Sequence, residues 1–251
     1  MGRINYYVKK YLKNRPAFFA FIRPIEAELF NNNYQFIKSP ILDFGCGDGF
    51  FAETVFGKGK IDIGLDLSSK KRINEAVIKK TYKKLVFYNG NKIPYPNHYF
   101  QTVISNCVLE HIQNIDHSLK EINRILKPKG FFFTSVMTDK WEDYLFGKKI
   151  FGSFYQKFMK KKQKHYQLLT VNEWKEKFIQ SGFKIEKITS YLDRETVSLI
   201  DVFHYLSLPY IVSNKFSFLY PPSFFIKKIE TLIKKTIHIN TAAGLFFILQ
   251  K

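Results

Sequence analysis

The sequence has little cysteine and no long apolar run. Cys46 and Cys107 are the only cysteines among 251 residues, and their spacing matches neither a metal-binding motif nor a disulfide framework. We therefore expect no metal site and a reducing, cytoplasmic compartment. Residues 1–15 are basic but lack the apolar stretch of a secretory signal. No run of about 18 uncharged apolar residues occurs, so we expect no membrane-spanning segment.

Acidic residues are scarce relative to basic ones. The chain has 21 acidic and 40 basic residues, which gives a formal charge of +19, and the excess is largest after residue 140. A surface of this charge attracts nucleic acid, anionic lipid or acidic glycans. However, 34 of the 40 basic residues are lysine, and abundant Lys, Asn, Ile and Phe can equally reflect an AT-rich genome. Charge alone therefore does not identify a substrate.

Internal repeats and low-complexity linkers are also absent. A composition of 45% hydrophobic and 24% charged residues is typical of a globular protein. We expect one domain over residues 1–251. Within it, residues 1–40 form an N-terminal helical segment, residues 41–137 form the ligand-binding core, and residues 138–168 and 192–242 are cap insertions that contact the substrate.

The sequence does contain an alternation of apolar strands and amphipathic helices. Strands are expected at residues 41–44, 61–67, 85–88, 100–105, 130–137, 184–191 and 243–249. Helices are expected at residues 50–56, 70–80, 116–126 and 170–181, the last with Gly182 as its C-cap. This alternation predicts an α/β fold with a doubly wound, mostly parallel sheet, whose ligand lies beyond the carboxyl ends of the strands.

The first expected strand ends in a glycine-rich turn, Asp43-Phe44-Gly45-Cys46-Gly47-Asp48-Gly49, that leads directly into a helix. Backbone amides are uncovered at such a turn, and a ligand can approach the chain closely. The dinucleotide fingerprint requires its third glycine at position 50, where Phe50 stands. The sequence therefore disfavours a nicotinamide cofactor.

The same turn resembles the first motif of the class I S-adenosylmethionine-dependent methyltransferases, acidic-x-Gly-x-Gly-x-Gly. The resemblance covers roughly residues 38–137 and is closest to the small-molecule, type 11-like branch. It continues through Gly64-Leu65-Asp66-Leu67-Ser68, residues 89–96, residues 105–112 and residues 119–130. It implies a Rossmann-like, seven-stranded sheet with an antiparallel last strand, and S-adenosyl-L-methionine as the cofactor.

The resemblance also implies which residues bind that cofactor. Gly45 and Gly47 are expected under its methionine part with Asp43 close by, and Asp66 is expected to accept hydrogen bonds from the ribose hydroxyls. The family commonly has an acidic residue followed by a small one where this chain has Asn89-Gly90-Asn91, so the side chain that meets the adenine amine is left open. The expected cofactor-binding residues are Asp43, Gly45, Cys46, Gly47, Gly49, Asp66, Leu67, Asn89, Gly90, Asn91, Asn106 and Val108.

Methyl transfer from a sulfonium is an in-line displacement, in which positioning accounts for most of the catalysis. For a hydroxyl acceptor a base assists, and His111, His165 and His204 are candidates by residue type. We expect His111 and His165 to be the catalytic residues, although each can instead support the pocket or pack within it. Asp139 and Trp141 are candidates to line the acceptor pocket.

Residues 196–235 combine aromatic side chains with paired lysines, which suits an apolar or amphiphilic acceptor. Ile226, Ile229, Ile233 and Ile237 have helical spacing, as in a helix on an anionic membrane surface or in a cap helix packed on the sheet.

The whole chain is similar to methyltransferases of surface polysaccharide and lipid biosynthesis. The resemblance implies a small-molecule acceptor, a hydroxyl of a surface glycan or lipid-linked intermediate. The enzyme would then be cytoplasmic or peripheral at the inner membrane face. An RNA methyltransferase, which the missing Asn-Pro-Pro-aromatic motif opposes, and a non-catalytic cofactor-fold module remain alternatives.

Overall fold

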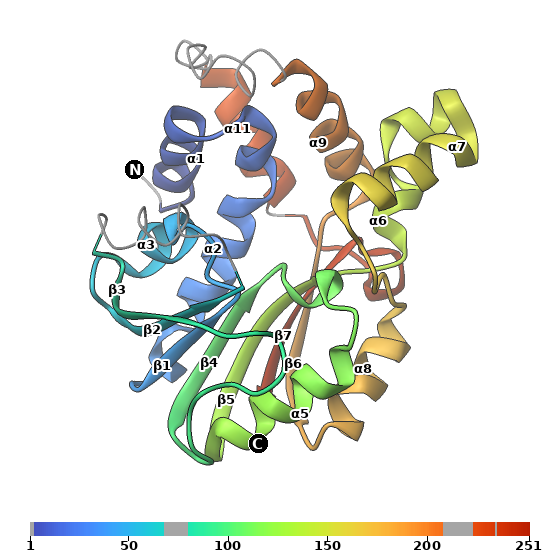
Figure 1. The fold of residues 1–251 in the computed structure, drawn as a ribbon. Helices are drawn as coiled ribbons and strands as arrows, with labels where there is room; N and C mark the ends of the chain where they lie inside the picture. Colours follow the sequence, from blue (N-terminus) through green and yellow to red (C-terminus); the bar gives the residue numbers. More distant parts are fainter. Residues whose placement is uncertain (1–2, 68–79, 208–222, 234) are drawn as a thin grey trace.

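The computed structural model describes residues 3–67, 80–207, 223–233 and 235–251. In this part of the chain, strands β1 to β7 form one seven-stranded sheet in the order β3-β2-β1-β4-β5-β7-β6 (Figure 1). Strands β3, β2, β1, β4 and β5 run parallel, and β7 is antiparallel to both β5 and β6. The expected doubly wound sheet with an antiparallel last strand is thus confirmed. The strands are β1 (Ile41–Phe44), β2 (Ile61–Asp66), β3 (Tyr82–Phe87), β4 (Phe100–Asn106), β5 (Leu126–Met137), β6 (Lys184–Tyr191) and β7 (Gly244–Gln250).

Two strands begin earlier than the sequence predicted. Strand β3 begins at Tyr82 rather than at residue 85, because Lys83 and Lys84 are exposed on an edge strand and interrupt its apolar pattern. Strand β5 begins at Leu126 rather than at residue 130. The ladder shifts register between Phe100 and Thr102 of β4, and Lys129 adopts a positive φ of 63°. This irregularity lets Pro128 lie within the strand instead of ending it.

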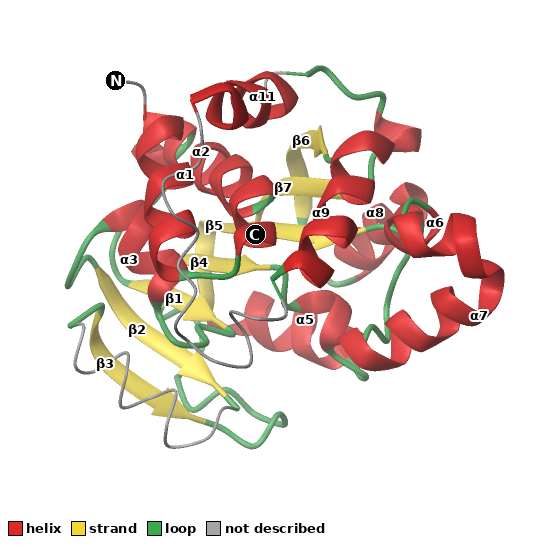
Figure 2. Cartoon of the chain, turned by 90° about the horizontal axis from the view of Figure 1, so that it is seen from above, coloured by secondary structure: helices red, strands yellow, loops and turns green. Residues whose placement is uncertain are grey.

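Helices cover both faces of the sheet (Figure 2). Helices α5 (Ile115–Ile125) and α8 (Val171–Gln180) pack on one face, and α1 (Arg3–Asn14), α2 (Arg23–Asn32) and α3 (Phe50–Phe56) pack on the other. Helix α8 begins with a capping box between Thr170 and Glu173. Its C-cap is Ser181 rather than the predicted Gly182, which follows with a φ of 85° and lets the amide of Phe183 reach the carbonyl of Phe178. The helix expected at residues 70–80 lies outside the described residues, apart from Lys80.

The insertion at residues 138–168 is largely helical, although the sequence pattern predicted no helix there. It contains α6 (Lys140–Asp143) and α7 (Phe146–Gln163), and Gly152 interrupts the helical geometry of α7 with a φ of 60°. The break, together with several exposed phenylalanines, hides the helical period from the sequence pattern. The second insertion contains α9 (Arg194–Leu206) and α11 (Ser223–Ile233), and residues 208–222 between them lie outside the described residues.

The isoleucine stripe near residues 226–237 packs on the protein. Ile229 and Leu232 are buried, and Ile226 is partly buried against the same apolar cluster. Ile226 and Ile229 therefore pack on the protein as expected of a cap helix. Among the described residues, no helix is both long enough and apolar enough to cross a bilayer.

Candidate active site

The turn between β1 and α3 brings its backbone against the loop that follows β4. Gly45, Gly47 and Gly49 all have positive φ, at 77°, 55° and 75°. A Cβ on Gly45 would lie 2.5 Å from both methyl carbons of Val108, whereas a Cβ on Gly47 would meet nothing within 4 Å. Glycine is therefore required at position 45 by the neighbouring loop, and the space beside Gly47 is open to a ligand.

Asp66, the last residue of β2, stabilises the glycine turn through a hydrogen bond. The amide of Gly47 donates to Oδ2 of Asp66 at 2.6 Å. The other carboxylate oxygen, Oδ1, makes no hydrogen bond within the described part of the chain. One oxygen thus fixes the turn, and the second can accept a hydrogen bond from a bound hydroxyl.

A first cavity of about 390 Å³ lies along the carboxyl ends of β1, β2 and β4. Its walls are mostly apolar, and Asp66 contributes a carboxylate group to them. It is lined by Phe44, Gly45, Asp66, Leu67, Tyr88, Gly90, Val108, His111, Ile112, Gln113, Ser118 and Tyr166. Five of the twelve residues predicted to bind a cofactor line it: Gly45, Asp66, Leu67, Gly90 and Val108.

Other predicted cofactor residues support the turn from behind. Asp43 is buried and accepts a hydrogen bond from the hydroxyl of Tyr82 at 2.5 Å, and burial raises the pKa of Asp43 to about 7. Cys46 is also buried, and its carbonyl lies 3.4 Å from the Tyr82 hydroxyl. Gly49 is the N-cap of α3. These residues shape the turn, and their contact with a cofactor stays a prediction, as it does for Gly47.

The three predicted asparagines do not line the first cavity. Asn89 accepts a hydrogen bond from the amide of Asn91, which stabilises the loop around Gly90. Asn106 faces the N-terminal segment instead, because its amide donates to Glu26 at 2.9 Å and its oxygen accepts from Ser135. Their predicted roles toward a cofactor remain untested.

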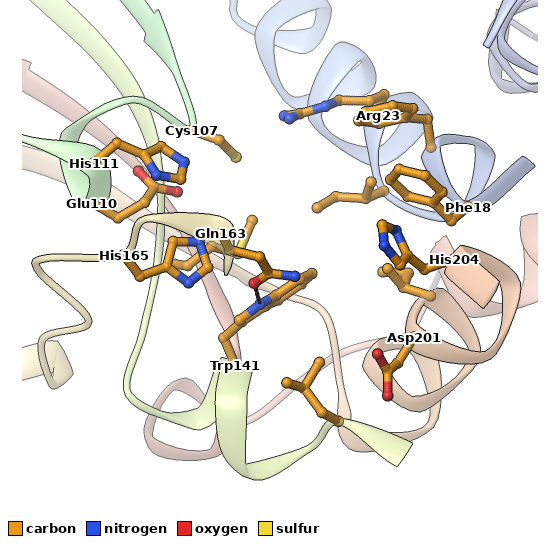
Figure 3. Close-up of a pocket in the computed structure, with 15 residues that line it drawn as sticks. Phe18, Arg23, Cys107, Glu110, His111, Trp141, Gln163, His165, Asp201 and His204 are labelled. Atoms are coloured by element: carbon orange, nitrogen blue, oxygen red, sulfur yellow. Dashed lines mark hydrogen bonds between the residues drawn. The ribbon is translucent and has the colours of Figure 1, made fainter. Parts of the chain in front are cut away.

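A second cavity of about 300 Å³ lies beside the first. Figure 3 shows Glu110, His111 and His165 on one side of it and Phe18, Arg23 and His204 facing them. It is lined by Phe18, Phe19, Ile22, Arg23, Cys107, Glu110, His111, Met137, Trp141, Leu145, Gln163, His165, Ile200, Asp201 and His204. His111 lines both cavities, so it marks the place where they meet.

The two predicted catalytic residues are neighbours in this structure. The ring centroids of His111 and His165 are 4.9 Å apart. The loop that carries His165 is held near His111, since the amides of Tyr166 and Gln167 both donate to the carbonyl of Glu110. Trp141 and His204 also line the second cavity, whereas Asp139 forms an ion pair with Lys140 and does not.

Two side chains that line the second cavity, Glu110 and His165, have buried polar atoms without partners, and so does Glu142 beside His165. Both carboxylate oxygens of Glu110, Oε1 of Glu142 and Nδ1 of His165 make no hydrogen bond within the described residues, and all three side chains are buried. Nδ1 of His165 lies 3.8 Å from Oε1 of Glu142, beyond hydrogen-bond distance. An unpaired buried polar group destabilises a protein by roughly 1–3 kcal/mol. These atoms are therefore suited to bind a polar group of a ligand.

Burial determines the protonation states of Glu110 and His111 in the cavity wall. It raises the pKa of Glu110 to about 8, and it lowers the pKa of His111 below its ordinary value. At neutral pH Glu110 is thus mainly protonated and His111 is neutral. Nδ1 of His111 lies 3.1 Å from the carbonyl oxygen of Lys164. Since a carbonyl only accepts, Nδ1 carries the proton and Nε2 is the free acceptor.

The N-terminal segment completes the second cavity through a buried carboxylate. Glu26 on α2 accepts hydrogen bonds from Arg23 at 2.6 Å, Tyr191 at 3.0 Å and Cys107 at 3.0 Å. Burial alone would lower the pKa of Arg23, but the adjacent Glu26 carboxylate outweighs it and raises that pKa. This cluster ties α2 to the loop after β4 and holds Arg23 at the cavity wall.

Several cavity residues were missed by the sequence analysis. Phe18 and Arg23, with Glu26 behind Arg23, lie in the N-terminal segment, which the motif resemblance does not reach. Glu110 lies within the motif segment 105–112, where a carboxyl group between Leu109 and His111 was an available signal. Asp201 of α9 accepts hydrogen bonds from the Gly147 amide and the Tyr155 hydroxyl, and no local pattern indicated it.

Replacing Glu110 with glutamine should change how stability depends on pH. The folded-state pKa of about 8 lies above the ordinary value of 4.5. The stability that the proton on Glu110 contributes is therefore fully present below about pH 4.5 and lost as the pH rises through 8. Glutamine cannot ionise, so at pH 9 the variant should melt roughly 5 °C above the wild type, measured by thermal denaturation. Glu121→Gln is the control because Arg124 lowers the pKa of Glu121, and melting curves for Glu110→Gln that parallel the wild type would contradict the prediction.

Comparison with known proteins finds similarity to methyltransferases. A family model described as a methyltransferase domain matches residues 42–134. The ubiquinone biosynthesis O-methyltransferase of Pelagibacter ubique is 29% identical over 111 residues, which are 42% of this chain and 45% of that protein. The chain thus spans about half the length of the curated relatives it matches.

Solved structures share the whole fold. An S-adenosylmethionine-dependent methyltransferase from Mesorhizobium loti matches with a TM-score of 0.57 at 18% identity, over 90% of this chain and 98% of that one. Another from Archaeoglobus fulgidus has a TM-score of 0.57 at 16% identity, over 98% of this chain and 99% of that one. At these identities the likeness concerns the fold alone.

The first cavity fits the cofactor of that family. The space beside Gly47 is open, since a Cβ there would meet nothing within 4 Å, and Asp66 keeps one carboxylate oxygen free beside apolar walls. S-adenosyl-L-methionine, when bound, supplies an electrophilic methyl group on a sulfonium. Residues 42–134 therefore form a methyltransferase domain, and the fold and glycine turn around them are those of the class I S-adenosylmethionine-dependent methyltransferases.

Proposed function

We propose that the protein transfers a methyl group from S-adenosyl-L-methionine to a hydroxyl of a small acceptor bound in the second cavity. The observation that carries the proposal is the pair of buried side chains with unpaired polar atoms, Glu110 and His165, that line a cavity meeting the first one at His111. A hydroxyl can both donate and accept, so it can satisfy such a mixed set of groups. The relative named as an O-methyltransferase supports an oxygen acceptor.

The lining of the second cavity indicates the character of the acceptor. Most of the wall is aromatic or aliphatic, including Phe18, Met137 and Trp141. Such a wall favours the lipid-linked acceptor over a free surface glycan, because a sugar would bury several hydroxyls with too few partners. We therefore propose an acceptor with an apolar ring or chain and one reacting hydroxyl.

The side chains have distinct proposed roles in the reaction. A bond forms between the acceptor oxygen and the methyl carbon while the bond between that carbon and sulfur breaks, and the acceptor proton must leave. His111 is placed to take it, since Nε2 is the free acceptor nitrogen at the junction of the cavities. His165 and protonated Glu110 orient the hydroxyl. The aromatic wall keeps water from the methyl group.

Labelled methyl transfer tests the proposal directly. The purified protein is incubated with methyl-labelled S-adenosylmethionine and separated host lipids, small molecules, glycans and RNA, and the labelled fraction is identified by mass. Label in a lipid or small-molecule hydroxyl is expected. Label in RNA would favour the RNA alternative and overturn the proposal. Cofactor binding without label in any fraction would favour the non-catalytic module.

The role of His111 can be measured once a labelled acceptor is known. His111→Gln should lower kcat by roughly tenfold, less than general bases often contribute, because alignment of oxygen, methyl and sulfur accounts for most of the catalysis. The affinity for the cofactor should stay within about twofold. His238→Gln, an exposed histidine that lines neither cavity, is the matched control and should leave kcat nearly unchanged. An unchanged kcat in His111→Gln would remove His111 from the reaction.

A further inference from the structure

Helix α7 presents large apolar side chains to solvent. Ile150, Phe151, Phe154 and Phe158 are 60%, 63%, 78% and 51% exposed. In both overall views α7 lies at the edge of the molecule (Figures 1 and 2). A surface with this many exposed phenylalanines in one helix is unusual for a soluble protein and indicates an interaction site.

The exposed face is held in place by the rest of the helix. The hydroxyl of Tyr155 donates to Asp201 at 2.7 Å, and the amide of Gly147 donates to the same carboxylate at 2.9 Å. Met159 is buried as well. Helix α7 is therefore fixed to α9 by its inner side, and its phenylalanines point outward from an ordered support.

Positive charge surrounds these phenylalanines. Residues 146–164 contain seven lysines and no acidic residue. Five of the lysines are exposed and form no ion pair within the described part of the chain: Lys149, Lys157, Lys160, Lys161 and Lys164. The surface thus combines an apolar centre with unpaired cations, which is the composition of helices that lie in the interface of an anionic membrane.

We propose that α7 docks the protein on an anionic phospholipid surface, with Phe154 and Phe158 inserted among the acyl chains and the lysines at the phosphate groups. A second copy of this chain fits less well, because two α7 surfaces would bring fourteen lysines together. RNA would attract the lysines but offers no apolar phase for Ile150 and the phenylalanines.

The docking surface adjoins the second cavity. Leu145 precedes α7 and Gln163 ends it, and both line that cavity, as does His165 shortly after. A protein docked through α7 would therefore hold its acceptor cavity close to the lipid. The inference stands on the exposed face and its charge, and it does not depend on the proposed function.

Vesicle flotation tests the inference with the full-length protein. Vesicles of phosphatidylcholine with phosphatidylglycerol should bind the wild type at low salt, and vesicles of phosphatidylcholine alone should bind it far less. The double variant Phe154→Ser with Phe158→Ser should bind at least about a hundredfold more weakly. Lys160→Gln with Lys161→Gln should weaken binding by roughly thirtyfold, since each lysine near such a surface contributes about 1 kcal/mol.

Two variants serve as matched controls. Ile179→Ser removes an exposed apolar side chain from α8, and Lys58→Gln with Lys60→Gln removes two exposed lysines near α3. Both should float like the wild type. Wild-type protein that does not float, α7 variants that float unchanged, or a dimer that Phe154→Ser dissociates without any vesicle binding would each overturn the proposal. Thermal denaturation and cofactor titration of every variant show whether its fold is intact.

Discussion

Replacing Gly45 with alanine should strongly weaken cofactor binding. The added Cβ would lie 2.5 Å from both methyl carbons of Val108, at a φ of 77° that alanine adopts only with strain. Strain of about 1–2 kcal/mol and overpacking of about 1–3 kcal/mol act together at this position. Val108 has a branched, stiff side chain and lines the first cavity, so its displacement also moves the loop that carries His111. We expect a rise in Kd of roughly a hundredfold to a thousandfold.

Isothermal titration with S-adenosylmethionine measures this effect, and Gly57→Ala is its control. Gly57 has a comparable φ of 86°, but its Cβ would meet nothing within 4 Å. Gly57→Ala should therefore lower the free energy of unfolding by about 1 kcal/mol and leave Kd unchanged. The double variant Gly45→Ala with Val108→Ala relieves the clash and should recover part of the affinity. Wild-type affinity in Gly45→Ala alone would show that the turn does not hold the cofactor.

The cofactor side of the molecule could be predicted from sequence because its determinants are local. The turn at residues 43–49 joins a buried strand to a helix, and Asp66 ends the next strand, so parallel pairing brings both to one edge of the sheet. Short apolar runs with glycine at their ends mark these strands clearly. Asn106 also ends a parallel strand, yet it faces Glu26 instead of the first cavity. Strand position therefore predicts the edge of the sheet but not the direction of each side chain.

The acceptor side could not be predicted because its contacts are long-range. Glu26 meets Cys107 and Tyr191, which are 81 and 165 residues away in sequence. Asp201 similarly joins α9 to residues 147 and 155 of α7. Neither carboxylate belongs to a sequence motif. Each lies on a helix, and the sequence does not indicate which other element that helix packs against. A cavity built from five separate segments leaves no local pattern.

Changing Asp66 to asparagine should weaken cofactor binding by roughly a hundredfold. Asparagine keeps one oxygen that can accept from the Gly47 amide, as Oδ2 does now at 2.6 Å. Its amino group replaces the free oxygen, and an amino group cannot accept a hydrogen bond from a ribose hydroxyl. Hydrogen bonds to a charged group contribute about 1.5–3 kcal/mol each, so the loss of one or two gives the expected factor.

The matched control for Asp66→Asn is Asp62→Asn on the same strand. Asp62 accepts hydrogen bonds from Ser39, the Ile41 amide and Lys83, all at the opposite end of β2 from the first cavity. That change should lower the melting temperature without altering Kd, because it removes the same charge from the same strand but away from the cavity. Comparable titrations of both variants thus separate the loss of a hydroxyl contact from a general loss of β2 stability. A Kd for Asp66→Asn within about threefold of the wild type would place the sugar of the cofactor elsewhere.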